Sequence, residues 1–216
     1  MKVVDFSKSN SVVNKLLAEI RDVNVQNDRL RFRSNLSRIG AIMAYEISRT
    51  ISYEREDVTT PFGIAEVQVP TDQIVAATIL RAGLPMQQGV LEMFDDAETA
   101  FVSAYRKYDD DYNFDIHIEY IASPSLDDKV LILCDPMLAT GGSMQLAYEA
   151  LLTKGTPHKL HVISVIASRQ ALEYLEENLP SDATVWVAAV DEYLDQHKFI
   201  VPGLGDAGDL AFGEKE

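Results

Sequence analysis

One stretch of the sequence sets the architecture of the whole chain: Val130-Leu131-Ile132-Leu133-Cys134-Asp135-Pro136-Met137-Leu138-Ala139-Thr140-Gly141-Gly142-Ser143-Met144. Its first five residues form a short, continuous apolar run, which is typical of a strand buried on both faces. Asp, Pro, Thr and two glycines then interrupt the strand, and apolar residues recur at helical spacing from Met144 to Leu151. Lys154 and Gly155 mark the expected end of that helix. The stretch therefore predicts a strand, a loop and a helix in succession.

The loop has the composition of a phosphate site. Residues 140–143, Thr-Gly-Gly-Ser, put small side chains where backbone N–H groups converge at a helix N-terminus, so that amides, two hydroxyls and the helix dipole can hold an anion. Alone, such a segment is more often an ordinary turn with a helix cap. Asp135 lies at the carboxyl end of the strand, where α/β sheets bind ligands, and its carboxylate can accept hydrogen bonds from vicinal sugar hydroxyls. Together these residues predict a sugar phosphate as ligand.

The same residues closely resemble the 5-phosphoribosyl 1-diphosphate (PRPP) motif of the type I phosphoribosyltransferases, and in particular that of the uracil phosphoribosyltransferase family. Relatives that act on other bases usually carry two adjacent acids at the start of this motif. Here the first of those positions is Cys134, which favours the uracil branch over the purine and orotate branches. The resemblance implies that PRPP contacts Asp135, Pro136, Met137, Leu138, Ala139, Thr140, Gly141, Gly142 and Ser143.

Length and composition limit the class of protein. The 216 residues fit one α/β domain with appendages better than two domains. A net charge of −15 and a pI near 4.6 disfavour nonspecific binding to nucleic acid or to anionic membranes, so we expect neither as a partner. With no signal-like N-terminus and no apolar run approaching a membrane span, a cytoplasmic location is expected. The single cysteine, Cys134, is expected to be a core residue and not a nucleophile.

The first 70 residues predict two helices and an arm. Apolar stripes indicate a helix over about residues 10–23, capped by Ser9 or Asn10, and a second helix over about residues 28–48. In the second helix, Arg31, Arg33 and Arg38 are expected to form a solvated face. Residues 52–69 read as two strand-like halves around a Pro-Phe-Gly turn, which predicts a β-hairpin arm. Such an arm often packs on a second subunit, so we expect a homodimer or a higher homo-oligomer.

Two arginines follow the next strands. Residues 73–80 form a clear buried strand that ends in Arg81-Ala82-Gly83, where a guanidinium can bind phosphate in a bidentate manner and a glycine lets the backbone approach a ligand. The surrounding residues resemble the family's diphosphate-binding loop, although Pro85 departs from the usual residue. A strand over residues 99–105 precedes Arg106, which the resemblance makes a second PRPP contact. The aspartates at 109–111 are expected to lie in a solvated loop.

The remaining core elements alternate between strands and helices. Residues 114–121 alternate in polarity, which suggests an antiparallel strand of a hood over the site, and two more buried strands flank a helix over residues 169–178. The predicted fold class is α/β, similar to the type I phosphoribosyltransferases, with a mostly parallel central sheet flanked by helices, a hood and a β-hairpin arm. We expect one domain, 1–216, divided into N-terminal helices (1–50), arm (51–70), core (71–190) and tail (191–216).

The tail is expected to recognise the base. Residues 199–209 contain three glycines, a proline and two aspartates, so a regular helix or strand cannot run through the whole segment. Uracil offers two carbonyl acceptors and an N3–H donor that backbone groups can match, whereas cytosine would leave buried groups unpaired. The segment resembles the family's uracil-binding loop, with Val201 as a departure. The match implies uracil contacts from Ile200, Gly205, Asp206 and Ala207, with Asp206 also reaching PRPP and Asp209 acting as a structural hydrogen-bond acceptor.

The three motifs together imply transfer of the phosphoribosyl group from PRPP to uracil, giving UMP and diphosphate. By the resemblance the catalytic residues are Asp135, Arg106 and Asp206, and Mg²⁺ is the expected cofactor, held mainly through substrate and waters. GTP stays open as an effector, as in some relatives. Two alternatives also stay open, namely a phosphoribosyltransferase for another base and a pyrimidine-responsive RNA-binding regulator of the same fold, which the net charge disfavours.

Overall fold

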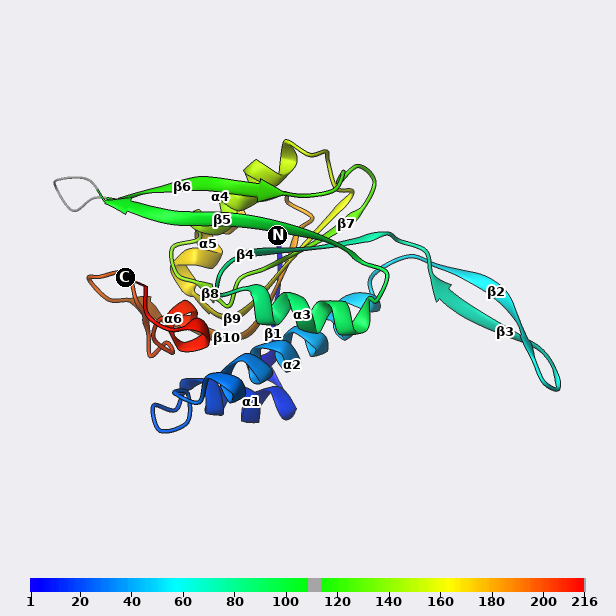
Figure 1. Ribbon diagram of the computed structural model, residues 1–216, viewed down its shortest axis with the longest axis horizontal. Coiled ribbons are helices and arrows are strands. Elements are labelled where there is room, and N and C mark those ends of the chain that lie inside the picture. Colours follow the sequence, from blue (N-terminus) through cyan, green and yellow to red (C-terminus); the bar gives the residue numbers. More distant parts are fainter. Residues whose placement is uncertain (109–113, 216) are drawn as a thin grey trace.

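The computed structural model describes residues 1–108 and 114–215, and for residues 104–108 and 114–118 it describes the backbone alone. A central sheet lies between two layers of helices, and a two-stranded arm projects away from this body (Figure 1). The predicted loop at residues 109–111 lies outside the described residues.

The central sheet follows the order β1-β10-β9-β7-β4-β5-β6, with the short β8 beside β9. Every pair is parallel except β5 with β6. The prediction of a mostly parallel sheet is therefore confirmed, as is the antiparallel strand that follows residue 113. The strands are β1 (Lys2–Asp5), β4 (Ile74–Leu80), β5 (Glu98–Tyr108), β6 (Phe114–Ala122), β7 (Val130–Cys134), β8 (Met137–Leu138), β9 (Lys159–Ser168) and β10 (Thr184–Asp191).

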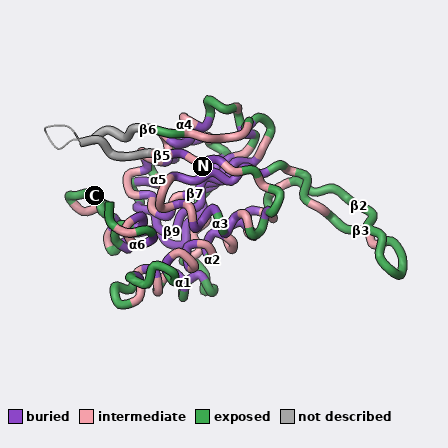
Figure 2. Tube along the Cα trace, viewed as in Figure 1, coloured by how far each residue is buried: buried purple, intermediate pink, exposed green. Residues whose placement is uncertain are grey.

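Each face of the sheet has its own helical layer. On one side the core joins β4 residues Ile74 and Ala76 to helices α1 (Val12–Arg21), α2 (Arg29–Ser48), α3 (Leu84–Met93) and α6 (Ala207–Phe212). On the other side it joins the alternate residues Val75 and Ala77 to α4 (Gly142–Leu152) and α5 (Arg169–Asn178). Because successive side chains of a strand point to opposite faces, this alternation covers the sheet on both sides. Figure 2 shows the resulting buried interior.

The N-terminal region differs from its prediction in three details. The first residues form strand β1, which pairs in parallel with β10 and precedes a short 3-10 helix (Phe6–Lys8). Helix α1 is capped by Ser11 and not by Ser9 or Asn10: Ser11 Oγ accepts the Val13 amide at 3.3 Å, and the Ser11 amide donates to Asn14 Oδ1 at 2.9 Å. The arginine face of α2 is also not wholly solvated, since Arg33 donates to the Ala211 carbonyl at 2.7 Å.

The predicted arm is confirmed as an antiparallel hairpin of β2 (Tyr53–Thr60) and β3 (Gly63–Pro70). It is largely exposed along its length (Figure 2). Among the described helices, none is both long and apolar enough to traverse a bilayer.

The topology fixes where a ligand would bind. Strands β4 and β7 are neighbours, yet the chain leaves β4 through α3 on one face and leaves β7 through α4 on the other. In open α/β sheets the crevice beyond the carboxyl ends of two such strands is the usual ligand site. The loops that begin with Arg81 and Asp135 both start there.

Candidate functional site

The loop after β7 is fastened to β9 by backbone hydrogen bonds. The Asp135 amide donates to the Ile163 carbonyl at 3.2 Å, and the Pro136 carbonyl accepts the amides of Val165 and Ile166, each at 3.1 Å. Strand β8 then pairs with β9. The loop surrounds a pocket of about 40 Å³ lined by Asp135, Met137, Leu138, Ala139, Thr140, Gly141, Ser143 and Met144. The structure thus brings together the predicted PRPP residues of this stretch, except Pro136 and Gly142.

Helix α5 supports the same loop from behind. Ser168, the N-cap of α5, donates its hydroxyl to the Ala139 carbonyl at 2.5 Å and accepts the Ala171 amide at 2.9 Å. Gly141, the N-cap of α4, has φ +86°, and a Cβ added there would lie 2.9 Å from Tyr174 Cδ1. Gly141, Ser143 and Met144 line the pocket, so the N-terminus of α4 lies beside it with no side chain on the cap, which is the arrangement that suits an anion.

The Arg81 loop lies directly against the start of the Asp135 loop. A Cβ added to Gly83 would overlap both the Thr78 hydroxyl and the Cys134 carbonyl, so only a glycine permits this approach. The peptide bond between Leu80 and Arg81 is cis. The two loops predicted to hold PRPP are thus neighbours at one edge of the sheet.

Arg81 also joins this edge to the C-terminal tail. Its Nη2 donates to Asp209 Oδ1 at 3.1 Å and to the Gly213 carbonyl at 3.3 Å. The expectation that Asp209 is a structural acceptor is confirmed by the first of these bonds. The tail is therefore anchored to one of the residues predicted to bind the donor.

The tail contains a short hairpin and a helix that pack on the main core. Strands β11 (Tyr193–Leu194) and β12 (Ile200–Val201) pair antiparallel, the Val201–Pro202 peptide is cis, and helix α6 follows. Asp206 caps α6 by accepting the Asp209 amide at 3.0 Å. The Ile200 and Ala207 side chains are buried in the core, so these two residues offer a ligand mainly their backbone groups.

A second pocket, of about 230 Å³, lies between this tail and the loop that joins α1 to α2. Sequence reasoning identified Gly205, Asp206 and Asp209 in this region but missed the residues that the other loop supplies. A run of polar residues before Asp28 is the signal that was available, and it does not reveal which distant segment those residues meet. The lining residues are Gln26, Asn27, Arg29, Gly205, Asp206, Asp209, Leu210 and Glu214.

Arg106 belongs to β5, where its backbone pairs with Ile116 of β6. Leu80 of β4 pairs with Ser103, so Arg106 lies beyond the last residue of β4 on the neighbouring strand. The position of its side chain lies outside what the structure describes.

Cys134 is fully buried at the end of β7. Burial, and then the nearby Asp135 carboxylate, raise the pKa of its thiol far above the usual range. A neutral, buried thiol is a poor nucleophile. The prediction that Cys134 is a core residue is therefore confirmed.

Comparisons with known proteins agree with these features. The sequence model of the family "Uracil phosphoribosyltransferase" matches residues 7–214. A protein of that name from Porphyromonas gingivalis is 59% identical over 215 residues, covering 100% of both chains, and one from Methanothermobacter thermautotrophicus is 40% identical, covering 99% of this chain and 95% of its own. A solved structure from Aquifex aeolicus superimposes with a TM-score of 0.87 at 29% identity, covering 98% of each chain. The chain belongs to the uracil phosphoribosyltransferase family.

Proposed function

We propose that this enzyme makes UMP and diphosphate from uracil and PRPP at the edge of the sheet where the Arg81 and Asp135 loops meet. Membership of the family is the evidence for the reaction. The observation that supports the location is the pocket formed by the loop after β7, which is lined both by Asp135 and by Gly141, Ser143 and Met144 at the start of α4. A phosphate group and vicinal hydroxyls are the ligands that such a pair suits.

In this proposal three segments of the chain bind different parts of PRPP. Thr140, Gly141, Gly142 and Ser143 hold the 5′-phosphate, with Pro136, Met137, Leu138 and Ala139 shaping the same loop. Asp135 accepts hydrogen bonds from the ribose hydroxyls. Arg81 and Arg106 bind the diphosphate. The support is that the Arg81 and Asp135 loops begin at the carboxyl ends of β4 and β7, and that Arg106 lies on β5 beyond the last residue of β4.

The tail holds the acceptor base. Backbone groups of Ile200, Gly205 and Ala207 match the uracil carbonyls and N3–H, and Asp206 contacts both substrates. The support is that two of these side chains are buried, which leaves the backbone to face a ligand, and that Arg81 ties the tail to the donor loops.

The reaction forms a bond from uracil N1 to ribose C1, breaks the bond from C1 to the diphosphate oxygen, and releases the N1 proton. Positive charge develops on the ribose ring while negative charge grows on the leaving diphosphate. Arginine side chains at the diphosphate stabilise this second charge more strongly in the transition state than in the ground state.

Magnesium is part of the proposal. The described residues contain no group of three or more His, Cys, Asp and Glu side chains that could hold a metal ion. Mg²⁺ usually keeps several waters and binds through one or two carboxylates plus substrate phosphates, and Asp135 and Asp206 are the carboxylates of the proposed site. When bound, the ion supplies positive charge at the diphosphate.

A homodimer and activation by GTP complete the proposal. The exposed arm supports the dimer, and the family resemblance supports the effector.

A spectrophotometric assay of the purified protein with PRPP, Mg²⁺ and each base tests the proposed reaction. We expect UMP from uracil and at least 100-fold lower rates with cytosine, since unpaired buried groups cost about 1–3 kcal/mol each. Transfer to a purine, or to no base, would refute the assignment. Repeating the assay at low PRPP with and without GTP tests the effector.

A further inference from the structure

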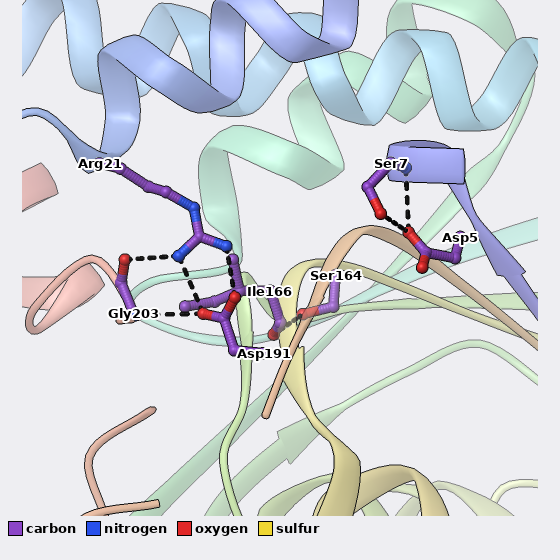
Figure 3. A network of polar contacts seen from close by, with 7 residues as sticks. All are labelled: Asp5, Ser7, Arg21, Ser164, Ile166, Asp191 and Gly203. Atoms are coloured by element: carbon purple, nitrogen blue, oxygen red, sulfur yellow. Dashed lines mark hydrogen bonds and ion pairs between the residues drawn. The ribbon is translucent and has the colours of Figure 1, made fainter. Parts of the chain in front are cut away.

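A partly buried ion pair holds the turn of the tail in place (Figure 3). Arg21 binds Asp191 through two parallel hydrogen bonds, from Nη1 to Oδ2 at 2.8 Å and from Nη2 to Oδ1 at 2.6 Å. Arg21 Nη1 also donates to the Gly203 carbonyl at 2.8 Å. The Gly203 amide in turn donates to Asp191 Oδ2 at 3.0 Å. Both backbone polar groups of Gly203 are therefore bound by one charged pair.

The three residues come from three different elements, and Arg21 is far from the other two along the chain. Arg21 is the last residue of α1, Asp191 is the last residue of β10, and Gly203 follows β12. The Asp191 side chain is 6% exposed and that of Arg21 is 21% exposed. Because charge-assisted, bidentate bonds in such a position are strong and directional, they fix the Gly203 peptide groups against the rigid sheet.

Gly203 lies between the two parts of the tail that are proposed to read uracil. Ile200 precedes it and Gly205 follows it, and the base is to be recognised by backbone groups whose directions depend on the turn between them. Gly203 has φ +63°, and a Cβ added there would overlap the Ile200 carbonyl, so the turn is tight as well as anchored. Holding recognition groups in place before binding improves affinity because less order must be imposed on binding.

We propose that Arg21 and Asp191 are positioning residues for uracil, which act by fixing the Gly203 turn of the tail. This inference rests on the proposed function of the tail. It assigns a role in base recognition to two residues that contact neither substrate.

Two conservative variants test this role, because each keeps a polar side chain of similar size at its position. Asp191→Asn keeps the shape and one acceptor but removes the charge, and Arg21→Lys keeps the charge but cannot make the bidentate bond and the Gly203 bond together. We expect each to raise the KM for uracil about tenfold, the equivalent of one lost hydrogen bond, while the KM for PRPP changes less than about twofold. The double variant should be little worse than either single one, because both act through the same turn.

Glu192→Gln provides the matched control. Glu192 is the next residue along the chain, and its carboxylate makes an exposed pair with Arg169 of α5 at 3.2 Å instead of a bond to the Gly203 turn. It should leave both KM values unchanged. The melting temperature of each variant, measured in parallel, shows whether a change in KM comes from lost stability or from altered binding of uracil.

An unchanged KM for uracil in both variants would overturn the inference. So would a parallel rise in both KM values with loss of melting temperature, or failure of both variants to fold, because the pair would then support the fold alone. If the wild-type enzyme itself transfers nothing to uracil, the proposed function falls first, and this inference falls with it.

Discussion

Gly203 and Gly205 both adopt positive φ in the tail, at +63° and +94°, but their surroundings differ. A Cβ at Gly203 would overlap the Ile200 carbonyl, whereas the nearest atom to a Cβ at Gly205 is Leu210 Cδ1 at 3.7 Å. The first position is therefore restricted by both conformation and space, and the second by conformation alone.

This contrast predicts different costs for alanine. We expect Gly203→Ala to lower the free energy of unfolding by about 2–5 kcal/mol, since overpacking adds to the left-handed backbone cost. Gly205→Ala should lower it by only about 1–2 kcal/mol. Urea denaturation of the two variants measures both values. Equal losses would mean that the Ile200 carbonyl moves aside without cost.

A residue-scale prediction also concerns pH. His161 is buried, and its Nδ1 accepts the Trp186 indole N–H at 3.1 Å, which fixes the neutral tautomer. Burial, and then the charge of Lys159, lower the pKa of His161 to about 4. The unfolded chain, with a pKa near 6.5, binds this proton at a higher pH than the folded protein does. This contribution to stability is therefore complete above about pH 6.5 and is lost as the pH falls towards 4.

His161→Gln isolates that contribution, because glutamine retains an acceptor for Trp186 but does not titrate. We expect the advantage of the wild type over the variant to shrink by about 2–3 kcal/mol between pH 7 and pH 4. Denaturant unfolding of both proteins at a series of pH values gives the difference directly, and the carboxylates that both share cancel. A difference that stays constant across this range would show that folding does not lower the pKa of His161.

At the scale of the elements, helix α5 has a role beyond covering the sheet. Its N-cap Ser168 bonds both to its own helix and to the Ala139 carbonyl of the pocket loop. We expect Ser168→Ala to lower stability by about 0.5–2 kcal/mol, as for other lost caps. It should also raise the KM for PRPP about tenfold, because the loop loses a support.

Ser11→Ala is the control for this change. Ser11 caps α1 in the same way but does not touch the loop. It should cost similar stability with no change in the KM for PRPP. If both variants alter that KM equally, general loosening of the protein and not the Ser168 bond explains the effect.

Element prediction worked where the sequence pattern was local. Helix α5 has the limits that were predicted, and β7 follows directly from its apolar run. Strand β1 was missed because four residues with a lysine and an aspartate carry no strand pattern, and only pairing with β10 makes them one. Helix α6 was missed because its glycine and alanines give no amphipathic stripe, and its Asp206 cap is evident only from the hydrogen bond.

At the scale of the whole molecule, the alternation of strands and helices was enough to predict a mostly parallel sheet covered on both faces. The candidate site was predictable as far as it lies on strand ends, as with Asp135 and Arg81. The pocket between the α1–α2 loop and the tail was not, because Gln26 and Asp206 meet only through tertiary packing. The Arg21–Asp191 pair was missed for the same reason.

The arm leads to the last prediction. Phe62 at its tip is 101% exposed and Ile64 is 71% exposed, and a two-stranded hairpin is at best marginally stable alone in water. Packing of these side chains against a second copy of the chain would remove apolar surface from water and stabilise the arm. We therefore expect a homodimer in analytical ultracentrifugation at micromolar concentration. Phe62→Ser with Ile64→Ser should raise the dimer Kd at least tenfold. Val23→Ser, at an equally exposed apolar residue outside the arm, should leave it unchanged. A wild type that sediments as a monomer at every concentration would leave the arm without this role.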